Sequence, residues 1–310
     1  MNSFTERIDA LRRDRRAIIL AHYYQRPEVQ ALADCVGDSL ELARRAAGTD
    51  AEVIVFCGVH FMAETAAILN PDKTVLLPDL GAGCPMAEMV TPEALGAWKV
   101  DHPDAVVVTY VNSTAAVKAL SDVCCTSSNA LEVVSGIEPG REILFCPDRN
   151  LGHWVRRQVR RQVTVWNGWC PTHQRILPEH VAEARLRHPA AAVVVHPECR
   201  PEVVDLADEV ASTSGILRIC GQREEKEFII GTENGFLDVL RLHCPEKRFY
   251  PASELAGCPN MKRITPEKVL ASLETLQPTI AVPRPVAAAA RLPLKRMLSF
   301  GQTHRTVAAS

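Results

Sequence analysis

Three cysteines that are each followed by proline recur at nearly equal spacing in this sequence. They are Cys84, Cys170 and Cys258, which are 86 and 88 residues apart. The chain has 11 cysteines, an odd number, which favours metal binding or catalysis over a disulfide framework. Three thiolates suit an iron–sulfur cluster or zinc, and a metal with three protein ligands keeps one position open for catalysis. Each cysteine also precedes an expected helix start, whose dipole would stabilise the thiolate. The alternative is a repeated turn in which Cys-Pro serves only the scaffold.

Groups that can donate hydrogen bonds or exchange protons share this spacing, because each follows one of three apolar runs. Three pairs of residues stand at or just beyond the ends of these runs, two positions apart in each pair: His22 and Tyr24, Tyr110 and Asn112, and His196 and Glu198. Histidine, tyrosine and carboxylate side chains are typical carriers of protons in general acid–base catalysis. We therefore expect a functional site where these chain segments meet.

Three loops that open helices contain small hydroxyl residues. They are Gly37–Ser39, Thr126–Asn129 and Ser212–Gly215. Their side chains can cap the helices, and the free N–H groups of a helix start can bind a carboxylate or a phosphate. Considered alone, these residues are ordinary caps, so the ligand interpretation depends on the loops facing the same site as His22, Tyr110 and His196.

A repeated helix signal indicates which elements position these residues. Thr91-Pro92-Glu93, Leu177-Pro178-Glu179 and Thr265-Pro266-Glu267 have the same spacing as the Cys-Pro pairs. Proline suits the first position of a helix, and glutamate is favoured at the positive end of the helix dipole. The predicted helices are Pro92–Val100, Pro178–Arg187 and Pro266–Leu276, with Glu6–Asp14 in the same role at the N-terminus.

Short continuous apolar runs alternate with these helices. Runs that are apolar on both faces are typical of buried strands in a parallel sheet. The predicted strands are Ala17–Ala21, Val53–Cys57, Thr74–Leu77, Ala105–Val108, Ile143–Cys146, Gln162–Trp166, Ala191–Val195, Phe228–Ile230 and Arg248–Tyr250. The sequence thus predicts an α/β fold of three similar αβα sandwich units with parallel sheets, in a pseudo-threefold arrangement around a central active site. In such sheets, ligands bind beyond the carboxyl ends of the strands.

The repeat also predicts where the units begin and end. We expect a first unit at 1–83, a second at 84–169 and a third at 170–278 that includes its closing helix. The segment 279–300 is expected to form a helix that docks on the first unit, and 301–310 a frayed end.

Charge and hydropathy exclude several classes of protein. With 35 basic and 37 acidic residues the net charge is −2, which argues against nucleic-acid binding through a basic surface. No apolar run approaches the roughly 18 residues of a membrane span. The charged N-terminus lacks the apolar core of a secretory signal. We expect a cytoplasmic protein with small-molecule ligands and no nucleic-acid or membrane partner.

Eight short motifs resemble those of the quinolinate synthase family, and the resemblance extends from about residue 15 to residue 275. They are AHYYQ at 21–25, GDS at 37–39, TYVNS at 109–113, CTSSNA at 125–130, PDRNLG at 147–152, NGWCPTH at 167–173, HPEC at 196–199 and AGCPNMK at 256–262. The resemblance implies three αβα domains around one site and a [4Fe–4S] cluster held by Cys84, Cys170 and Cys258, with one iron open.

The resemblance also implies a reaction. It joins iminoaspartate (iminosuccinate) to dihydroxyacetone phosphate, with loss of phosphate and water, and yields quinolinate for NAD biosynthesis. A separate enzyme would supply iminoaspartate from aspartate. The implied catalytic residues are Glu198, Tyr24, His22, His196 and Tyr110. The implied substrate-binding residues are His22, Ser39, Tyr110, Val111, Asn112, Ser127, His196, Pro197, Glu198 and Thr213.

Two other functions fit parts of the pattern. An iron–sulfur hydro-lyase of the aconitase type would also use a cluster with three cysteines, but it would act on a hydroxy acid without a phosphate ester. An iron–sulfur sensor or a zinc-stapled scaffold would need no dense set of histidine, tyrosine, glutamate and serine around the metal.

Overall fold

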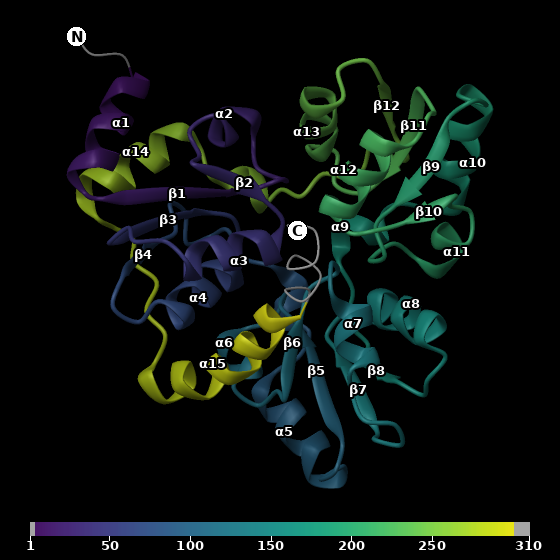
Figure 1. Ribbon diagram of the computed structural model, residues 1–310, viewed down its shortest axis with the longest axis horizontal. Coiled ribbons are helices and arrows are strands. Elements are labelled where there is room, and N and C mark those ends of the chain that lie inside the picture. The colour runs from purple at the N-terminus through teal and green to yellow at the C-terminus, as the bar shows by residue number, and fades with distance from the viewer. Residues whose placement is uncertain (1–3, 301–310) are drawn as a thin grey trace, which may run out of the picture.

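The computed structural model describes residues 4–300 as three four-stranded sheets that surround a common centre, each flanked by helices (Figure 1). All strand pairs within the sheets are parallel, and the three strand orders are equivalent: β2-β1-β3-β4, β6-β5-β7-β8 and β10-β9-β11-β12. The predicted fold class, α/β with three similar αβα units, is therefore confirmed.

The elements of the first sheet and its flanking helices come first in the chain. They are α1 (Phe4–Asp14), β1 (Ala17–His22), α2 (Pro27–Gln30), β2 (Cys35–Gly37), α3 (Ser39–Ala47), β3 (Val53–Cys57), α4 (His60–Leu69) and β4 (Thr74–Leu76). The second set is the short 3-10 helix η1 (Pro85–Glu88), α5 (Pro92–Asp101), β5 (Val106–Tyr110), α6 (Ala115–Lys118), β6 (Val123–Cys125), α7 (Ala130–Ser135), β7 (Ile143–Cys146), α8 (Arg149–Val159) and β8 (Thr164–Val165).

The third set repeats this order and is followed by two further helices. It consists of α9 (Pro171–Gln174), α10 (Pro178–Arg187), β9 (Ala192–Val195), α11 (Pro201–Val204), β10 (Glu209–Val210), α12 (Thr213–Gln222), β11 (Glu227–Gly231), α13 (Phe236–His243) and β12 (Arg248–Pro251). The 3-10 helix η2 (Met261–Arg263), α14 (Pro266–Thr275) and α15 (Arg284–Ser299) complete the described chain. Prolines stand at the first position of α5, α10 and α14, as predicted.

The sequence analysis missed the edge strands β2, β6 and β10, which are only two or three residues long. A repeated aspartate precedes each of them: Asp34, Asp122 and Asp208. Each carboxylate accepts a hydrogen bond of 2.7–2.8 Å from a backbone N–H of the neighbouring central strand. This contact fixes the start of the edge strand and is a signal that could have revealed it.

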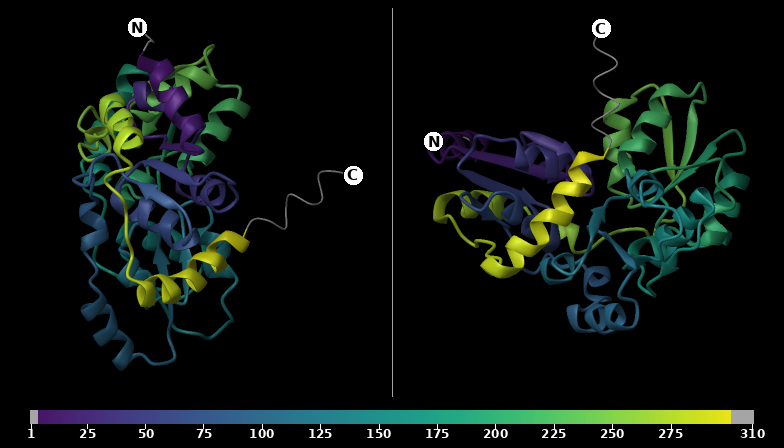
Figure 2. Two further views of the ribbon diagram at one scale, coloured as in Figure 1. Left: turned by 90° about the vertical axis from the view of Figure 1, so that its left-hand side faces the viewer. Right: turned by 60° about the horizontal axis from the view of Figure 1, so that its bottom comes forward.

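The last two helices make contacts that the sequence did not predict. Helix α14 was expected to close the third unit, but it packs against α1, α2 and β3 of the first set (Figure 1). Apolar packing accounts for this position, because Val269 and Leu273 are buried in the same hydrophobic cluster as Ile8 of α1. Helix α15 was expected to dock on the first unit; it contacts α4 and α3 there, but also α6 and β6 of the second set (Figure 2). It therefore joins two sheets.

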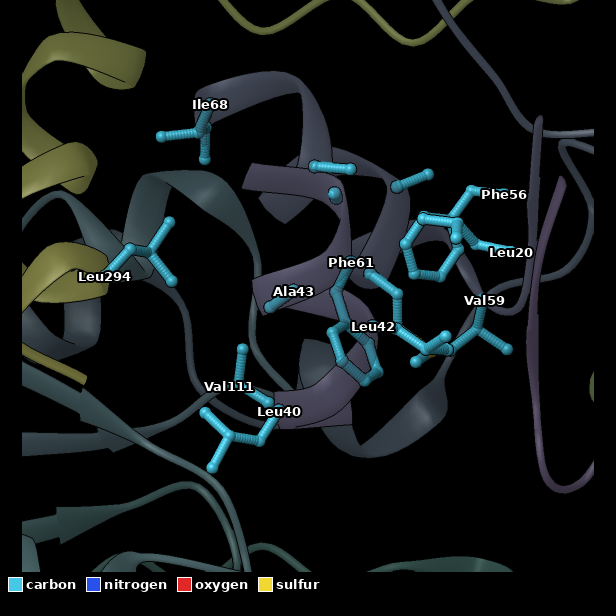
Figure 3. Close-up of a cluster of buried hydrophobic side chains, with 14 of the residues drawn as sticks. Leu20, Leu40, Leu42, Ala43, Phe56, Val59, Phe61, Ile68, Val111 and Leu294 are labelled. Atoms are coloured by element: carbon cyan, nitrogen blue, oxygen red, sulfur yellow. The ribbon is translucent and has the colours of Figure 1, made fainter. Parts of the chain in front are cut away.

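One apolar core extends across the contact between the first and second sets (Figure 3). Leu40 and Leu42 of α3, Ile68 of α4 and Leu294 of α15 belong to it. Val111, at the end of β5, lies beside Leu40 and is almost fully buried. The expected frayed end, 301–310, lies outside the described residues. Within 4–300, no helix has the length and apolar character needed to cross a membrane.

Candidate active site

A cavity of about 190 Å³ lies where the three sets of elements meet. Loops that follow the carboxyl ends of β1, β5 and β9 contribute to its wall, which agrees with the general rule for parallel sheets. Twelve of the residues singled out in the sequence line it: His22, Tyr24, Ser39, Cys84, Tyr110, Asn112, Ser127, Cys170, His196, Glu198, Thr213 and Cys258. Val111 and Pro197, which were also expected at the site, do not line the cavity.

A continuous chain of hydrogen bonds runs along one wall of the cavity. Tyr24 Oη is 2.6 Å from Thr232 Oγ1, which is 2.9 Å from His173 Nε2. His173 Nδ1 is 2.7 Å from Glu198 Oε2, and Tyr110 Oη donates to Glu198 Oε1 at 2.5 Å. Tyr24 and Tyr110, at the two ends of this series of hydrogen bonds, come from the first and second sets of elements, whereas Thr232, His173 and Glu198 belong to the third. The series is therefore complete only when all three sets are packed together.

Glu198 carries a charge at the centre of this chain although it is only 3% exposed. Burial opposes ionisation, but the positive charge of His173 and the hydrogen bonds from His173 and Tyr110 outweigh it and lower the pKa of Glu198 to about 2. Asn150 Nδ2 donates to the backbone carbonyl of Glu198 at 2.9 Å and fixes the loop from the second set. The carboxylate is thus held ionised with both oxygens engaged.

Tyr24 and Tyr110, at the two ends of this series of hydrogen bonds, stay protonated. Burial, followed by the negative charge of Glu198, raises the pKa of Tyr24 and of Tyr110 well above the usual value. Both phenols can therefore donate a hydrogen bond or a proton near neutral pH.

His22, the last residue of β1, and His196, the first residue after β9, make the same local contact. The Nδ1 atom of each accepts a hydrogen bond from the backbone N–H two residues later, that of Tyr24 at 3.1 Å and that of Glu198 at 3.3 Å. Burial lowers the pKa of His22 to about 4 and that of His196 to about 3. A neutral ring whose Nδ1 accepts carries its proton on Nε2. Both rings are therefore neutral donors, suited to an anionic ligand.

The helix-opening loops converge through Asp38. Its Oδ1 caps α3 by accepting from the N–H groups of Leu40 and Glu41 at 2.9 Å. Its Oδ2 accepts from Ser128 Oγ and from Ser214 Oγ, both at 2.6 Å. Asp38 therefore links one loop from each set and holds Ser39, at the start of α3, and Thr213, at the start of α12, at the cavity.

The three Cys-Pro cysteines line the same cavity and are partly buried. The expected stabilisation of their thiolates by helix starts is outweighed here. Burial raises the pKa of Cys84 to about 12 even though the N–H groups of Ala87 and Met86 lower it, and burial also raises the pKa of Cys170 and Cys258. These thiols need a bound cation to become thiolates.

The spacing of the thiols bears on which metal group fits. Among the described residues, the three sulfur atoms do not form a set that lies within 4.8 Å of one another. The sulfurs around a single tetrahedral zinc ion are only about 4 Å apart, because each Zn–S bond is about 2.3 Å. A larger group held by three thiolates, such as an iron–sulfur cluster, fits this donor set better than one zinc ion.

Buried carboxylates after β7 and β11 hold two of these cysteines by their backbone. Glu233 Oε1 accepts from the N–H of Cys258 at 3.1 Å, and Lys262 pairs with the same carboxylate at 3.3 Å. Asp148, which is fully buried, interacts with the backbone N–H of Cys170. These contacts position the cysteine-bearing loops.

Comparison with known proteins assigns the chain to a family. The family model described as quinolinate synthetase A protein matches residues 6–299. The chain belongs to the quinolinate synthetase A family. It is similar to the quinolinate synthase of Desulforudis audaxviator, with 57% identity over 94% of this chain and 97% of the relative. It is also similar to the quinolinate synthases of Thermodesulfovibrio yellowstonii, with 54% identity over 97% and 99%, and Methanoregula boonei, with 56% identity over 95% and 97%. The resemblance carried by the eight motifs is thus confirmed.

Several residues of this quinolinate synthetase A site were missed by sequence reasoning. His173 was quoted only as part of NGWCPTH, yet it lies three residues after Cys170, a spacing that brings two side chains to one face of a helix. Asp38 was included only as part of the loop Gly37–Ser39, and Thr232 was not singled out. No local signal reveals that Thr232 contacts Tyr24, because 208 residues separate them.

Proposed function

We propose that this chain is a quinolinate synthase. It would join iminoaspartate to dihydroxyacetone phosphate, with loss of phosphate and water, to give quinolinate for NAD biosynthesis. The observation that carries the proposal is one cavity lined by three cysteine thiols, two neutral histidines, two tyrosines and the hydroxyl-bearing starts of α3 and α12. Membership of the quinolinate synthetase A family supports it.

In this proposal Cys84, Cys170 and Cys258 hold a [4Fe–4S] cluster, one per chain. When bound, the cluster supplies a Lewis acid through the iron that has no cysteine ligand. Three cysteines would leave one iron of the cluster without a protein ligand.

The other residues of the cavity would bind the substrates. The two carboxylates and one phosphate of the substrates need hydrogen-bond donors. The neutral groups His22 Nε2–H, His196 Nε2–H and the hydroxyl of Ser127 can provide them. Ser39 and Thr213 lie at the first positions of helices of 9 and 10 residues, where N–H groups are free. Tyr110 and Asn112 would complete the contacts from the second set.

Proton transfer would use the hydrogen-bonded chain. Because both oxygens of Glu198 are engaged and its pKa is low, the carboxylate would serve to orient His173. His173 would then accept and return protons through Thr232 to Tyr24, which faces the cavity. Tyr24 and Tyr110, both protonated, would donate to oxygen atoms that leave or become negative.

The test is to prepare the chain anaerobically, load it with iron and sulfide, and supply dihydroxyacetone phosphate with iminoaspartate generated in the assay. Quinolinate and inorganic phosphate should form in equal amounts. Turnover of a hydroxy acid with no release of phosphate would instead favour a hydro-lyase of the aconitase type. The short-lived imine also requires a partner enzyme that oxidises aspartate, and adding such an enzyme should raise the yield of quinolinate.

A further inference from the structure

One wall of the cavity brings three different metal-binding atoms together. His173 Nδ1 is 3.1 Å from Cys170 Sγ and 2.7 Å from Glu198 Oε2, and all three atoms lie within 4.8 Å of one another. Within residues 4–300, no other three side chains of these types meet so closely. A thiolate, an imidazole and a carboxylate are the ligands that Zn²⁺ and similar divalent ions take in proteins.

The chain fixes these atoms in place. Cys170 and His173 stand three residues apart at α9, so their side chains share one face. Thr232 Oγ1 is 2.9 Å from His173 Nε2, and Tyr110 Oη donates a hydrogen bond to Glu198 Oε1 at 2.5 Å. Such outer contacts orient the ligands of known metal sites and raise their affinity.

Cys170, His173 and Glu198 all line the cavity, so the group of three atoms is open toward it. A tetrahedral ion with three protein ligands needs an open fourth position for water, and the cavity provides it. In the metal-free chain, hydrogen bonds occupy the space between the three atoms. A tetrahedral ion with bonds of about 2.0–2.3 Å holds its ligand atoms about 3.3–3.8 Å apart. The distance of 2.7 Å between His173 Nδ1 and Glu198 Oε2 would therefore have to lengthen when the ion replaces the hydrogen between them.

We propose that Cys170, His173 and Glu198 form a mononuclear site for a divalent ion of the zinc type in the cluster-free chain. The ion and the cluster exclude each other, because both need the thiolate of Cys170. The exclusion rests on the proposed function, in which Cys170 holds the cluster, whereas the mononuclear site does not depend on it.

Cobalt is the probe for this site, because tetrahedral Co²⁺ absorbs visible light and each thiolate bound to it adds a near-ultraviolet band. Cluster-free, reduced, full-length chain is titrated anaerobically with Co²⁺. We expect one ion per chain, tetrahedral visible bands and the intensity of a single thiolate. Binding of the ion by all three cysteines would instead give three times that thiolate intensity and would overturn the proposal, as would a dissociation constant weaker than about 1 mM.

Matched variants separate this site from the three cysteines as a group. Cys170→Ser and His173→Asn should weaken Co²⁺ at least tenfold, whereas their counterparts in the same cavity, Cys84→Ser and His196→Asn, should stay within about threefold of the unchanged chain. Thr232→Val keeps every ligand and should still weaken Co²⁺ by about 10–100-fold, since it removes the contact that orients His173. Equal losses in Cys84→Ser and Cys170→Ser would contradict the assignment, and circular dichroism confirms that each variant is folded.

Competition with the cluster is tested in the same chain. One equivalent of Zn²⁺, added before iron and sulfide, should slow cluster assembly in the unchanged chain and have no effect in His173→Asn. Equal slowing in both would overturn the exclusion. The cobalt titration uses neither cluster nor substrate, so its result stands apart from that of the quinolinate assay.

Discussion

Replacement of Glu198 by glutamine tests the hydrogen-bonded chain at its centre. The carboxylate accepts from Tyr110 at 2.5 Å and from His173 at 2.7 Å. A glutamine has one carbonyl oxygen, so its NH₂ group must face either the phenol or the imidazole. If it faces His173 Nδ1, the ring proton moves to Nε2, and His173 can no longer accept a proton through Thr232. Loss of general-base catalysis typically costs about 10²–10⁴-fold in rate, and a wrong histidine tautomer reaches the upper part of that range.

We therefore expect kcat of Glu198→Gln to fall about 10²–10⁴-fold, or about 3–5 kcal/mol in activation free energy. KM should change little, because size and hydrogen-bonding reach are kept. The assay is the rate of quinolinate formation together with the visible absorption of the cluster, which should remain. Glu202→Gln, an exposed glutamate on α11, is the control and should have the unchanged rate. A cluster-replete Glu198→Gln enzyme that turns over normally would remove the residue from the mechanism.

Three further predictions concern the cluster and the buried histidines. Replacement by serine of any one proposed cluster ligand, Cys84, Cys170 or Cys258, should abolish cluster absorption and activity. Cys146→Ser, at the end of β7, should keep both. Glu233→Gln weakens the contact with the Cys258 N–H, so a chelator should remove the cluster about tenfold faster than from the Glu254→Gln control. The folded pKa of His196, about 3, lies below its unfolded value near 6.5. The unfolded chain therefore binds an extra proton as the pH falls, which lowers the free energy of unfolding. Between pH 7 and pH 5, the free energy of unfolding of the cluster-free chain, measured in urea, should fall by about 2 kcal/mol less in His196→Asn than in the unchanged chain. An equal loss in both chains would contradict the burial of a neutral ring.

The central strands and the cavity could be predicted because the same pattern occurs three times. Strands β3 and β7 have the predicted bounds, since each continuous apolar run follows a glutamate and ends at a glycine or a proline. Edge strand β10 could not be found from an apolar run, because it contains only Glu209 and Val210 and both are partly exposed. Its marker is Asp208, whose role depends on a strand 15 residues away.

Contacts between the three sets of elements could not be predicted, because they depend on how the sets pack. The apolar face of α14 gave no sign that it would bury Val269 and Leu273 beside Ile8 of the first set. Val111 follows Tyr110 in a motif, yet it packs into the core beside Leu40. In an extended segment, successive side chains point to opposite sides, so only one of two neighbours faces the cavity.

A crystal structure of the cluster-loaded chain with quinolinate bound tests most directly whether this cavity is the active site. The account predicts a cluster on Cys84, Cys170 and Cys258, and quinolinate beside it with its carboxylates within hydrogen-bond distance of His196 and Thr213. Quinolinate bound outside the cavity, or a cluster held by other residues, would contradict the account.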